Sequence, residues 1–209
     1  MIRPVQALLG ALLLLVGFAI ALQSPRAAGA APNSRLASAV FAGGCFWCTE
    51  SDFDKVPGVV STISGYSGGR IANPTYEQVS SGGTGHIEAV KVIYDPAKVS
   101  YSKLVAHFFR TVDPLDGGGQ FCDRGSQYRS AIFVAGPAER RIAEATKGNA
   151  AALLKKPIAT QILAAAPFYP AEDYHQNYYK KNPTKYKYYR WRCGREARLT
   201  KVWGNSAGH

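Results

Sequence analysis

After position 37, segments with the apolar pattern of a strand alternate with segments with the apolar pattern of a helix. This order predicts short strands interleaved with helices. Residues 38–42 form an apolar run that ends at a pair of glycines, as expected of a buried strand followed by a tight turn. Apolar residues then recur at near-helical spacing over 45–55, until Pro57–Gly58 ends the predicted helix. Residues 59–66 are rich in β-branched side chains and predict a second strand.

Residues 86–94 show the strict alternation of a strand with two distinct faces. The two faces carry Ile87, Ala89, Lys91 and Ile93 on one side and Glu88, Val90, Val92 and Tyr94 on the other. A lone glutamate on a strand is usually a solvated residue. The spacing alone therefore assigns no chemistry to Glu88.

The rest of the chain up to residue 164 continues the same alternation. Ser100 resembles the N-cap of a helix that runs to Arg110. Residues 113–126 are glycine-rich and irregular, and 129–134 predict a strand. A helix is expected to start at Pro137 and run to about residue 154, with another strand over 158–164.

This order of elements favours an α/β (α+β) fold, a two-layer sandwich with a ferredoxin-like core and a mixed sheet. From Pro167 the chain becomes aromatic and basic. We expect a long irregular C-terminal tail there, with one short helix near 174–181. Residues 31–209 are predicted to form a single domain, since no internal repeat or low-complexity segment divides them.

Residues 1–30 differ from that domain and resemble a secretory signal peptide. Arg3 provides a short positive start, residues 7–22 are an unbroken apolar run, and 28–30 offer the small residues that a signal peptidase reads. We expect cleavage after Ala30 and export to the periplasm or the medium. An uncleaved anchor is less favoured, because the run is short for a span and no basic cluster follows it. A buried core helix is disfavoured because the run shows no amphipathic pattern.

The chain is basic, with 25 Lys+Arg against 14 Asp+Glu and a formal net charge of +11. Two of the cations, Arg3 and Arg26, lie in the predicted signal, so the mature chain keeps a charge of +9. Such an excess can indicate a nucleic-acid or membrane partner. It is weak evidence alone, because solubility also favours a net charge away from zero.

The four cysteines carry the most specific chemistry. Cys45 and Cys48 form a C-x-x-C pair directly after the glycine pair, where the predicted strand ends and the predicted helix begins. The free N–H groups and the positive end of a helix stabilise a thiolate, so we expect a lowered pKa for Cys45. Cys48 lies one helical turn further on, close enough to attack an oxidised Cys45. This pattern favours a redox-active thiol.

Two other interpretations of these cysteines fit less well. Buried inert cysteines are common, but a C-x-x-C pair after two glycines in an exported chain is an unusual place for one. A zinc site would need a second close pair, whereas Cys122 and Cys193 stand seventy-one residues apart. We therefore expect no metal.

Five blocks in this order resemble the A-type peptide methionine sulfoxide reductases. The blocks are Gly44–Trp47 with Glu50, Gly65–Gly69 with Asn73–Tyr76, Thr84–Val90 with Tyr94–Pro96, Asp123–Ser130, and Phe168–Gln176. Together they cover residues 40 to about 183. A match of this extent is far more specific than a single tetrapeptide.

The resemblance implies a peptide-methionine (S)-S-oxide reductase, with a role for each matching residue. Cys45 would attack the sulfoxide sulfur and become a sulfenic acid. Glu88 would supply a proton to the oxygen, with its pKa raised in an apolar pocket. The remaining matches are the hydroxyls of Tyr76 and Tyr128 at the oxygen, Asp123 acting through water, and Phe46 and Trp47 as the apolar wall for the S-methyl group.

The resemblance also implies a partner in the form of oxidised proteins or peptides that contain methionine sulfoxide. It implies no bound cofactor, because electrons come from a thioredoxin-like donor, here one in the cell envelope. Neither a nucleic acid nor a stable membrane partner is expected.

The sequence departs from many relatives at the second thiol. Relatives often have glycine at the position of Cys48 and a resolving cysteine in a glycine-rich tail, whereas the tail here, 188–194, is basic and aromatic. We expect Cys48 to be the resolving thiol, with Cys193 as the alternative. Cys122 could pair with Cys193 as a structural disulfide.

Two other functions fit the sequence less well. A C-x-x-C thiol–disulfide oxidoreductase would leave the Glu88 and tyrosine blocks unexplained. A nucleic-acid or surface-binding module could use the alternating aromatic and basic residues of 178–198, but export makes nucleic acid an improbable partner. His86 and His175 show no metal-ligand spacing, and both are interpreted as structural hydrogen-bonding residues.

Overall fold

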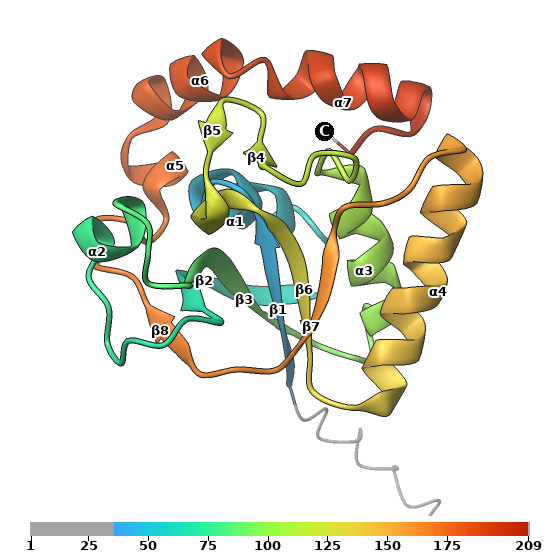
Figure 1. The fold of residues 1–209 in the computed structure, drawn as a ribbon, viewed down its shortest axis with the longest axis horizontal. Coiled ribbons are helices and arrows are strands. Elements are labelled where there is room, and N and C mark those ends of the chain that lie inside the picture. Colours follow the sequence, from blue (N-terminus) through green and yellow to red (C-terminus); the bar gives the residue numbers. More distant parts are fainter. Residues whose placement is uncertain (1–35, 209) are drawn as a thin grey trace, which may run out of the picture. The chain divides into compact units, whose positions relative to one another are not determined.

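The computed structural model describes residues 36–208, which belong to one compact unit of the chain. Its centre is a six-stranded sheet in the order β7-β6-β1-β3-β2-β8, in which β6 and β7 are parallel and all other neighbours antiparallel (Figure 1). The strands are β1 (Ala37–Gly43), β2 (Val59–Ser67), β3 (Ile87–Tyr94), β6 (Ser130–Val134), β7 (Gln161–Ala164) and β8 (Phe168–Pro170). The predicted signal peptide lies outside the described residues.

A ferredoxin-like unit lies inside this sheet. The helices α1 (Phe46–Phe53) and α3 (Tyr101–Arg110) connect its strands in the order β1-α1-β2-β3-α3-β6, and the four strands stand side by side as β6-β1-β3-β2. The predicted mixed α/β sandwich with a ferredoxin-like core is confirmed. Ser100 caps α3 as expected, with its hydroxyl accepting a 3.3 Å hydrogen bond from Lys103 N.

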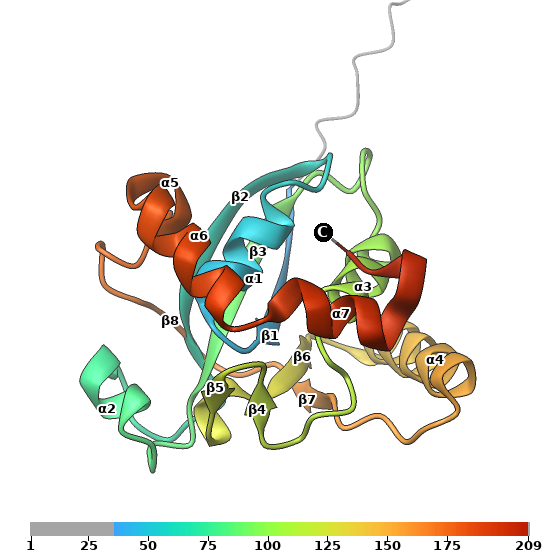
Figure 2. The same ribbon diagram turned by 90° about the horizontal axis from the view of Figure 1, so that it is seen from above.

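The helices cover one face of the sheet. The long helix α4 (Pro137–Leu154) packs beside α3, and their apolar residues share one core with Phe41, Val90, Val92 and Ile132 of the strands (Figure 2). The side chains that alternate with these, such as Ala42 and Ala89, belong to a smaller cluster on the opposite face. Glu88 therefore points to the face that α1 covers, in line with Val90 and Val92.

The C-terminal region differs from the expected irregular tail. It contains the expected short helix, α5 (Tyr178–Lys181), and two further helices, α6 (Pro183–Arg192) and α7 (Arg195–Trp203), which lie above α1 in the view of Figure 1. Their inward faces bury Tyr186, Leu199 and Trp203. The apolar pattern of these helices is sparse because their contacts to the core also use buried arginines, and a search for apolar periodicity misses such helices.

A short helix, a hairpin and two 3₁₀ turns complete the fold. The helix α2 (Tyr76–Ser80) starts with a capping box made by Thr75 and Gln78. A hairpin of β4 (Gly119–Gln120) and β5 (Asp123–Arg124) lies beneath α6, and short 3₁₀ turns span Ser126–Tyr128 and Gly204–Ser206. Within residues 36–208 no helix combines the length and the apolar character needed to cross a bilayer.

Candidate active site

Cys45 occupies the N-cap of α1, at the turn that connects it to β1. Gly44 makes this turn with a φ of 82°, and a Cβ at that position would lie 2.5 Å from Cβ of Gln120. Only glycine combines the left-handed backbone with this close approach. The sequence-predicted place of the thiol, between a strand and the start of a helix, is confirmed.

Glu88 reaches the same helix start from β3. Its Oε2 accepts a 3.0 Å hydrogen bond from the backbone N–H of Phe46, and only 2% of the residue is exposed. Burial raises the pKa of Glu88 to about 8, although the Phe46 N–H acts in the opposite direction. The expected upward shift is confirmed, and at neutral pH the carboxyl group holds a proton.

One cavity of about 190 Å³ brings the predicted residues together. It is lined by Cys45, Phe46, Trp47, Tyr76, Glu88, Asp123, Tyr128 and Tyr189. The first seven were singled out in the sequence, from four different motif blocks. Cys48 does not line this cavity and lies behind Cys45, packed against Tyr186.

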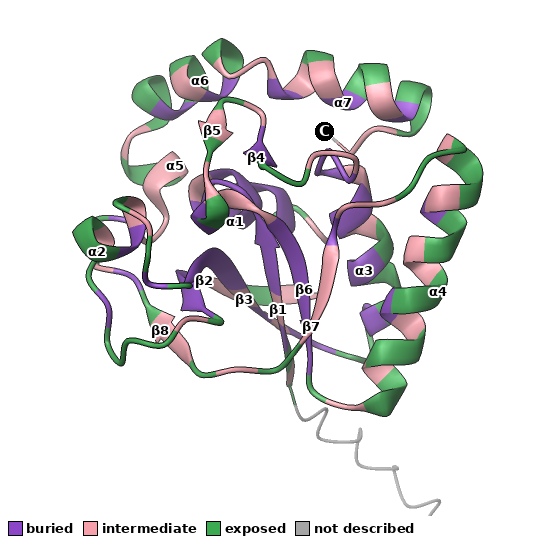
Figure 3. Cartoon of the chain, viewed as in Figure 1, coloured by how far each residue is buried: buried purple, intermediate pink, exposed green. Residues whose placement is uncertain are grey.

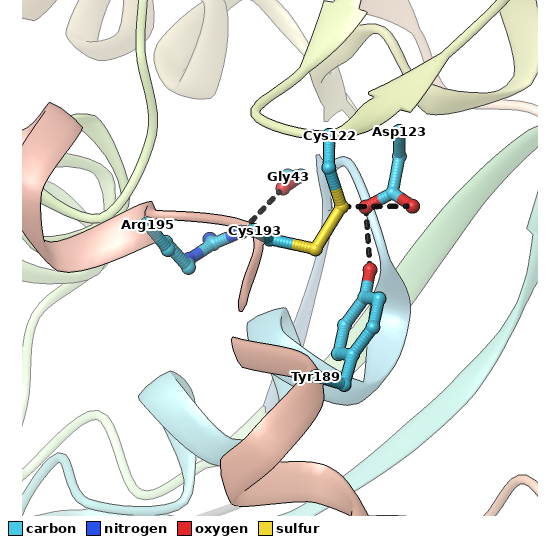
Figure 4. The surroundings of a disulfide bond; sticks show 6 residues. All are labelled: Gly43, Cys122, Asp123, Tyr189, Cys193 and Arg195. Atoms are coloured by element: carbon cyan, nitrogen blue, oxygen red, sulfur yellow. Dashed lines mark hydrogen bonds between the residues drawn. A yellow bond between two sulfur atoms is a disulfide. The ribbon is translucent and has the colours of Figure 1, made fainter. Parts of the chain in front are cut away.

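The hydroxyl groups of the cavity stay protonated. Burial raises the pKa of Tyr76 to about 12 and also raises that of Tyr128. Both are therefore neutral hydrogen-bond donors for an oxygen atom in the cavity. Asp123 accepts a 2.5 Å hydrogen bond from the hydroxyl of Tyr189, and its own pKa is raised by burial (Figure 4).

Tyr189 was missed in the sequence. Its segment was noticed only as an alternation of aromatic and basic residues. The sequence contains one indication of its role, because Tyr189 lies four residues before Cys193. On a helix, residues four apart lie on the same face, so both side chains would contact the same segment. That signal needed the helix to be predicted first.

The apolar wall is held in place by His175 of the fifth motif block and by Tyr178 of α5. Trp47 stacks on Tyr178 with ring centres 3.7 Å apart, and its indole N–H donates a 3.0 Å hydrogen bond to Nδ1 of His175. The His175 ring also lies 4.9 Å from that of Phe46 and 4.4 Å from that of Tyr76. His175 is therefore a hydrogen-bonding residue that fixes the wall.

The pKa of Cys45 differs from the expectation. Burial raises it well above its ordinary value, and the neighbouring Cys48, Glu88 and Asp123 act in the same direction. The pKa of Cys48 is lowered, first by the Cys45 side chain and then by the nearby Arg195 and Arg190, although burial acts in the opposite direction. Burial at the start of α1 raises the pKa of Cys45 by more than the positive end of the helix lowers it.

A buried charge cluster lies behind Cys48. Asp52 pairs with Arg190 at 2.8 Å and with Arg195 at 3.5 Å, and all three residues are less than 9% exposed. Arg195 also donates a 2.7 Å hydrogen bond to the carbonyl oxygen of Thr111. The two cations connect α6 and α7 to the thiol pair, and sequence patterns gave no indication of this.

Cys122 and Cys193 form a disulfide bond beside the cavity (Figure 4). The bond connects the β4–β5 hairpin to the end of α6. Three successive hairpin residues contact the C-terminal helices, because the Arg195 guanidinium lies 4.3 Å from the Phe121 ring centre and Asp123 binds Tyr189. Within residues 36–208, the only grouping of metal-ligand atoms is Cys122, Asp123 and Cys193. Its two sulfur atoms are bonded to each other and so are not free to act as ligands.

Cys45 at a helix start shares a cavity with a protonated acid and neutral hydroxyl groups, and a second thiol lies behind it. This arrangement defines a thiol-dependent oxidoreductase with a small-molecule-sized substrate site. Comparison with known proteins gives the family. The description of the peptide methionine sulfoxide reductase family matches residues 37–207. The chain belongs to this family, and it is an oxidoreductase that reduces methionine sulfoxide.

Individual relatives agree with this assignment. The chain is 56% identical over 169 residues to the peptide methionine sulfoxide reductase MsrA 2 of Rhizobium meliloti, covering 81% of this chain and 84% of the relative. It is 50% identical to MsrA of Bacillus subtilis, covering 79% of this chain and 95% of the relative.

Solved structures show the same fold. Methionine sulfoxide reductase A of Corynebacterium diphtheriae has a TM-score of 0.64 at 40% identity, covering 71% of this chain and 76% of that one. Reduced Mxr1 of Saccharomyces cerevisiae has a TM-score of 0.68 at 32% identity, covering 72% and 88%. Mxr1 has also been solved in complex with Trx2, with a TM-score of 0.50 at 24% identity, covering 70% and 86%.

Proposed function

We propose that this enzyme reduces the S-epimer of methionine sulfoxide with Cys45 as the nucleophile and Glu88 as the proton donor. The observation that carries this proposal is the shared cavity of Cys45 and Glu88, with the carboxyl group held at the start of the Cys45 helix. The S-methyl group lies against Phe46 and Trp47, and the oxygen faces Tyr76 and Tyr128. Asp123 acts on this oxygen through a water molecule.

The sulfur–oxygen chemistry balances within the cavity. The Cys45 sulfur attacks the sulfoxide sulfur after passing its proton to Cys48, the more acidic partner of the pair. Glu88 protonates the oxygen as the bond between sulfur and oxygen weakens. The bond from the methionine sulfur to oxygen and the transient bond between the two sulfur atoms both break, and the oxygen transfers to the Cys45 sulfur. Methionine leaves reduced by two electrons, and Cys45, oxidised by two electrons, becomes a sulfenic acid.

Cys48 then resolves the sulfenic acid. Cys48 gives up the proton that it took from Cys45, its thiolate attacks the Cys45 sulfur, a Cys45–Cys48 disulfide forms, and the proton leaves with the hydroxyl group as water. The two residues share the first turn of α1, so this step needs no movement of the tail. The alternative thiol, Cys193, is already bonded to Cys122. Peptide mapping after one turnover tests this step, and a Cys45–Cys193 bond without Cys45–Cys48 would refute it.

The reductant is a thioredoxin-like dithiol in the cell envelope, and the substrates are oxidised exported proteins. The complex of Mxr1 with Trx2 supports this class of partner. The signal-like pattern of residues 1–30 supports export. Cell fractionation and N-terminal sequencing of the mature chain test it, and a cytoplasmic chain that starts at residue 1 would contradict it.

Turnover of a sulfoxide-containing peptide with dithiothreitol, with the two epimers compared, tests the central proposal. We expect reduction of the S-epimer only and none in Cys45→Ser. Insulin reduction, the activity of a general thiol–disulfide oxidoreductase, serves as the comparison assay. Full activity in Cys45→Ser, or insulin reduction without sulfoxide reduction, would refute the proposal.

A further inference from the structure

Helix α6 exposes an aromatic and basic surface to solvent. Trp191 is 73% and Tyr188 is 58% exposed, with ring centres 6.1 Å apart. Lys185 and Arg192 are also exposed, and Figure 3 shows how α6 alternates exposed and buried residues. These four residues are called the α6 face below. Exposed aromatic side chains at a helix surface commonly mark interaction sites.

The α6 face adjoins the substrate cavity. Tyr189 of the same helix lines that cavity and binds Asp123. Lys185 and Arg192 lie four residues before and three residues after Tyr189, which places them one helical turn away on either side of it. Tyr186 and Arg190 point inward and are buried, so the orientation of the helix is fixed. A chain that delivers its side chain to the cavity would therefore pass the two cations.

The charges of the α6 face are uncompensated. α6 contains four cations and no acid. Arg190 is paired with Asp52 and Glu196, whereas none of the ion pairs formed within residues 36–208 includes the other three, Lys185, Lys187 and Arg192. Charge complementarity favours an acidic ligand for the two unpaired cations of the α6 face.

We propose that the α6 face binds acidic polypeptide segments next to a methionine sulfoxide, so that the enzyme prefers oxidised sites in acidic surroundings. This inference rests on the proposed function of the cavity. The two cations pair with acidic side chains of the substrate, and Tyr188 and Trp191 contact its apolar groups. The favoured partner is a polypeptide substrate because the two cations lie next to Tyr189, which lines the cavity.

The test uses the full mature enzyme, dithiothreitol and three substrates. These are N-acetylmethionine S-sulfoxide and two peptides that carry the sulfoxide between glutamates or between lysines. Wild-type enzyme should have a lower KM for the glutamate peptide, and added salt should remove the difference. Lys185→Glu and Arg192→Glu should each raise that KM about threefold, as expected for one exposed charge pair. Tyr188→Ala should raise the KM of both peptides.

Arg141→Glu is the matched control, because Arg141 is an exposed cation of α4, outside the cavity lining. It should leave all three substrates unchanged, and every variant should reduce N-acetylmethionine sulfoxide at the wild-type rate. Equal KM values for both peptides in wild-type enzyme would overturn the inference. Two parallel measurements complete the test: turnover with a thioredoxin-type reductant in place of dithiothreitol, and binding of single-stranded DNA. Variants that change only the KM of that reductant, or tighter binding of the DNA than of the glutamate peptide, would also overturn the inference. Failure to reduce the small sulfoxide would instead refute the proposed function.

Discussion

Oε2 of Glu88 accepts a 3.0 Å hydrogen bond from the backbone N–H of Phe46, which is the first residue of the helix that Cys45 caps. This contact fixes the acid of β3 beside the thiol of α1. It also has a chemical consequence, because a free N–H at a helix start stabilises a carboxylate. Glu88 can therefore release its proton to the substrate oxygen and leave a stabilised anion.

Replacing the acid tests its role in proton transfer. Glu88→Gln should lower kcat/KM by about a hundredfold or more, since it keeps an oxygen for the Phe46 N–H and loses the proton. In the wild-type enzyme, activity should fall as the pH rises through about 8, where Glu88 ionises. The measurement is a pH profile of kcat/KM from pH 5 to 9.5 for both proteins. A variant with the same alkaline decline would assign that decline to another group.

The same substitution should make the protein more stable at alkaline pH. Glu88 has an ordinary pKa of 4.5 and a pKa of about 8 in the fold, so unfolding releases its proton between these values. The folded state therefore loses stability as the pH rises from 4.5 to 8. Glu88→Gln should raise the free energy of unfolding by on the order of 2 kcal/mol at pH 8.5. Urea titrations of wild-type enzyme and Glu88→Gln at pH 4.5 and 8.5 measure this difference. The free energy of unfolding of the variant should not exceed that of wild-type enzyme at pH 4.5.

The sequence predicts the sheet, the two-layer core and the nucleophile because these depend on local patterns. The alternation of residues 87–94 assigns Glu88 to the face of Val90, and the glycine pair places Cys45 at a helix start. The resemblance to a family adds the tyrosines and Asp123, which spacing alone leaves as ordinary packing or surface residues.

The parts that were missed depend on contacts between distant segments. Arg190 and Arg195 are buried only because Asp52 lies opposite them, 138 and 143 residues earlier in the chain. Their helices therefore resembled a solvated basic tail. The pKa of Cys45 was predicted with the wrong sign for the same reason, since its burial depends on residues of α6.

The two candidate resolving thiols should differ in their kinetics. Cys48→Ser should still release about one methionine per enzyme because Cys45 accepts the oxygen, but more slowly than wild-type enzyme because Cys45 has lost its proton acceptor. It should then fail to turn over with a thioredoxin-like reductant. Cys193→Ser should release one methionine and continue to turn over. Rapid-quench measurement of methionine with both variants checks this, and continued turnover in Cys48→Ser together with arrest in Cys193→Ser would reverse the assignment.

Removing the Cys122–Cys193 bond should lower the stability of the fold but have little effect on the reduction of methionine sulfoxide. The bond spans 71 residues, and closing a loop of this length stabilises a fold by about 4 kcal/mol. Cys122→Ser should therefore lower the urea midpoint strongly, with native-like yield of methionine in the first turnover at 25 °C. Unfolding of wild-type enzyme under reducing conditions is the parallel measurement. An unchanged midpoint in both would show that the bond is not structural.

The cations behind Cys48 should set the rate of disulfide formation. Arg190 helps to lower the pKa of Cys48, so Arg190→Gln should raise that pKa and reduce the thiolate fraction at neutral pH. Conversion of the sulfenic acid to the Cys45–Cys48 disulfide should slow several-fold, and its pH dependence should shift to higher pH. Asp52 keeps a partner in Arg195, which limits the damage to the fold. Stopped-flow trapping of the sulfenic acid across pH 6 to 9 measures the step. Arg190→Lys retains the charge and should recover most of the rate, whereas an equal loss in both variants would assign Arg190 a packing role only.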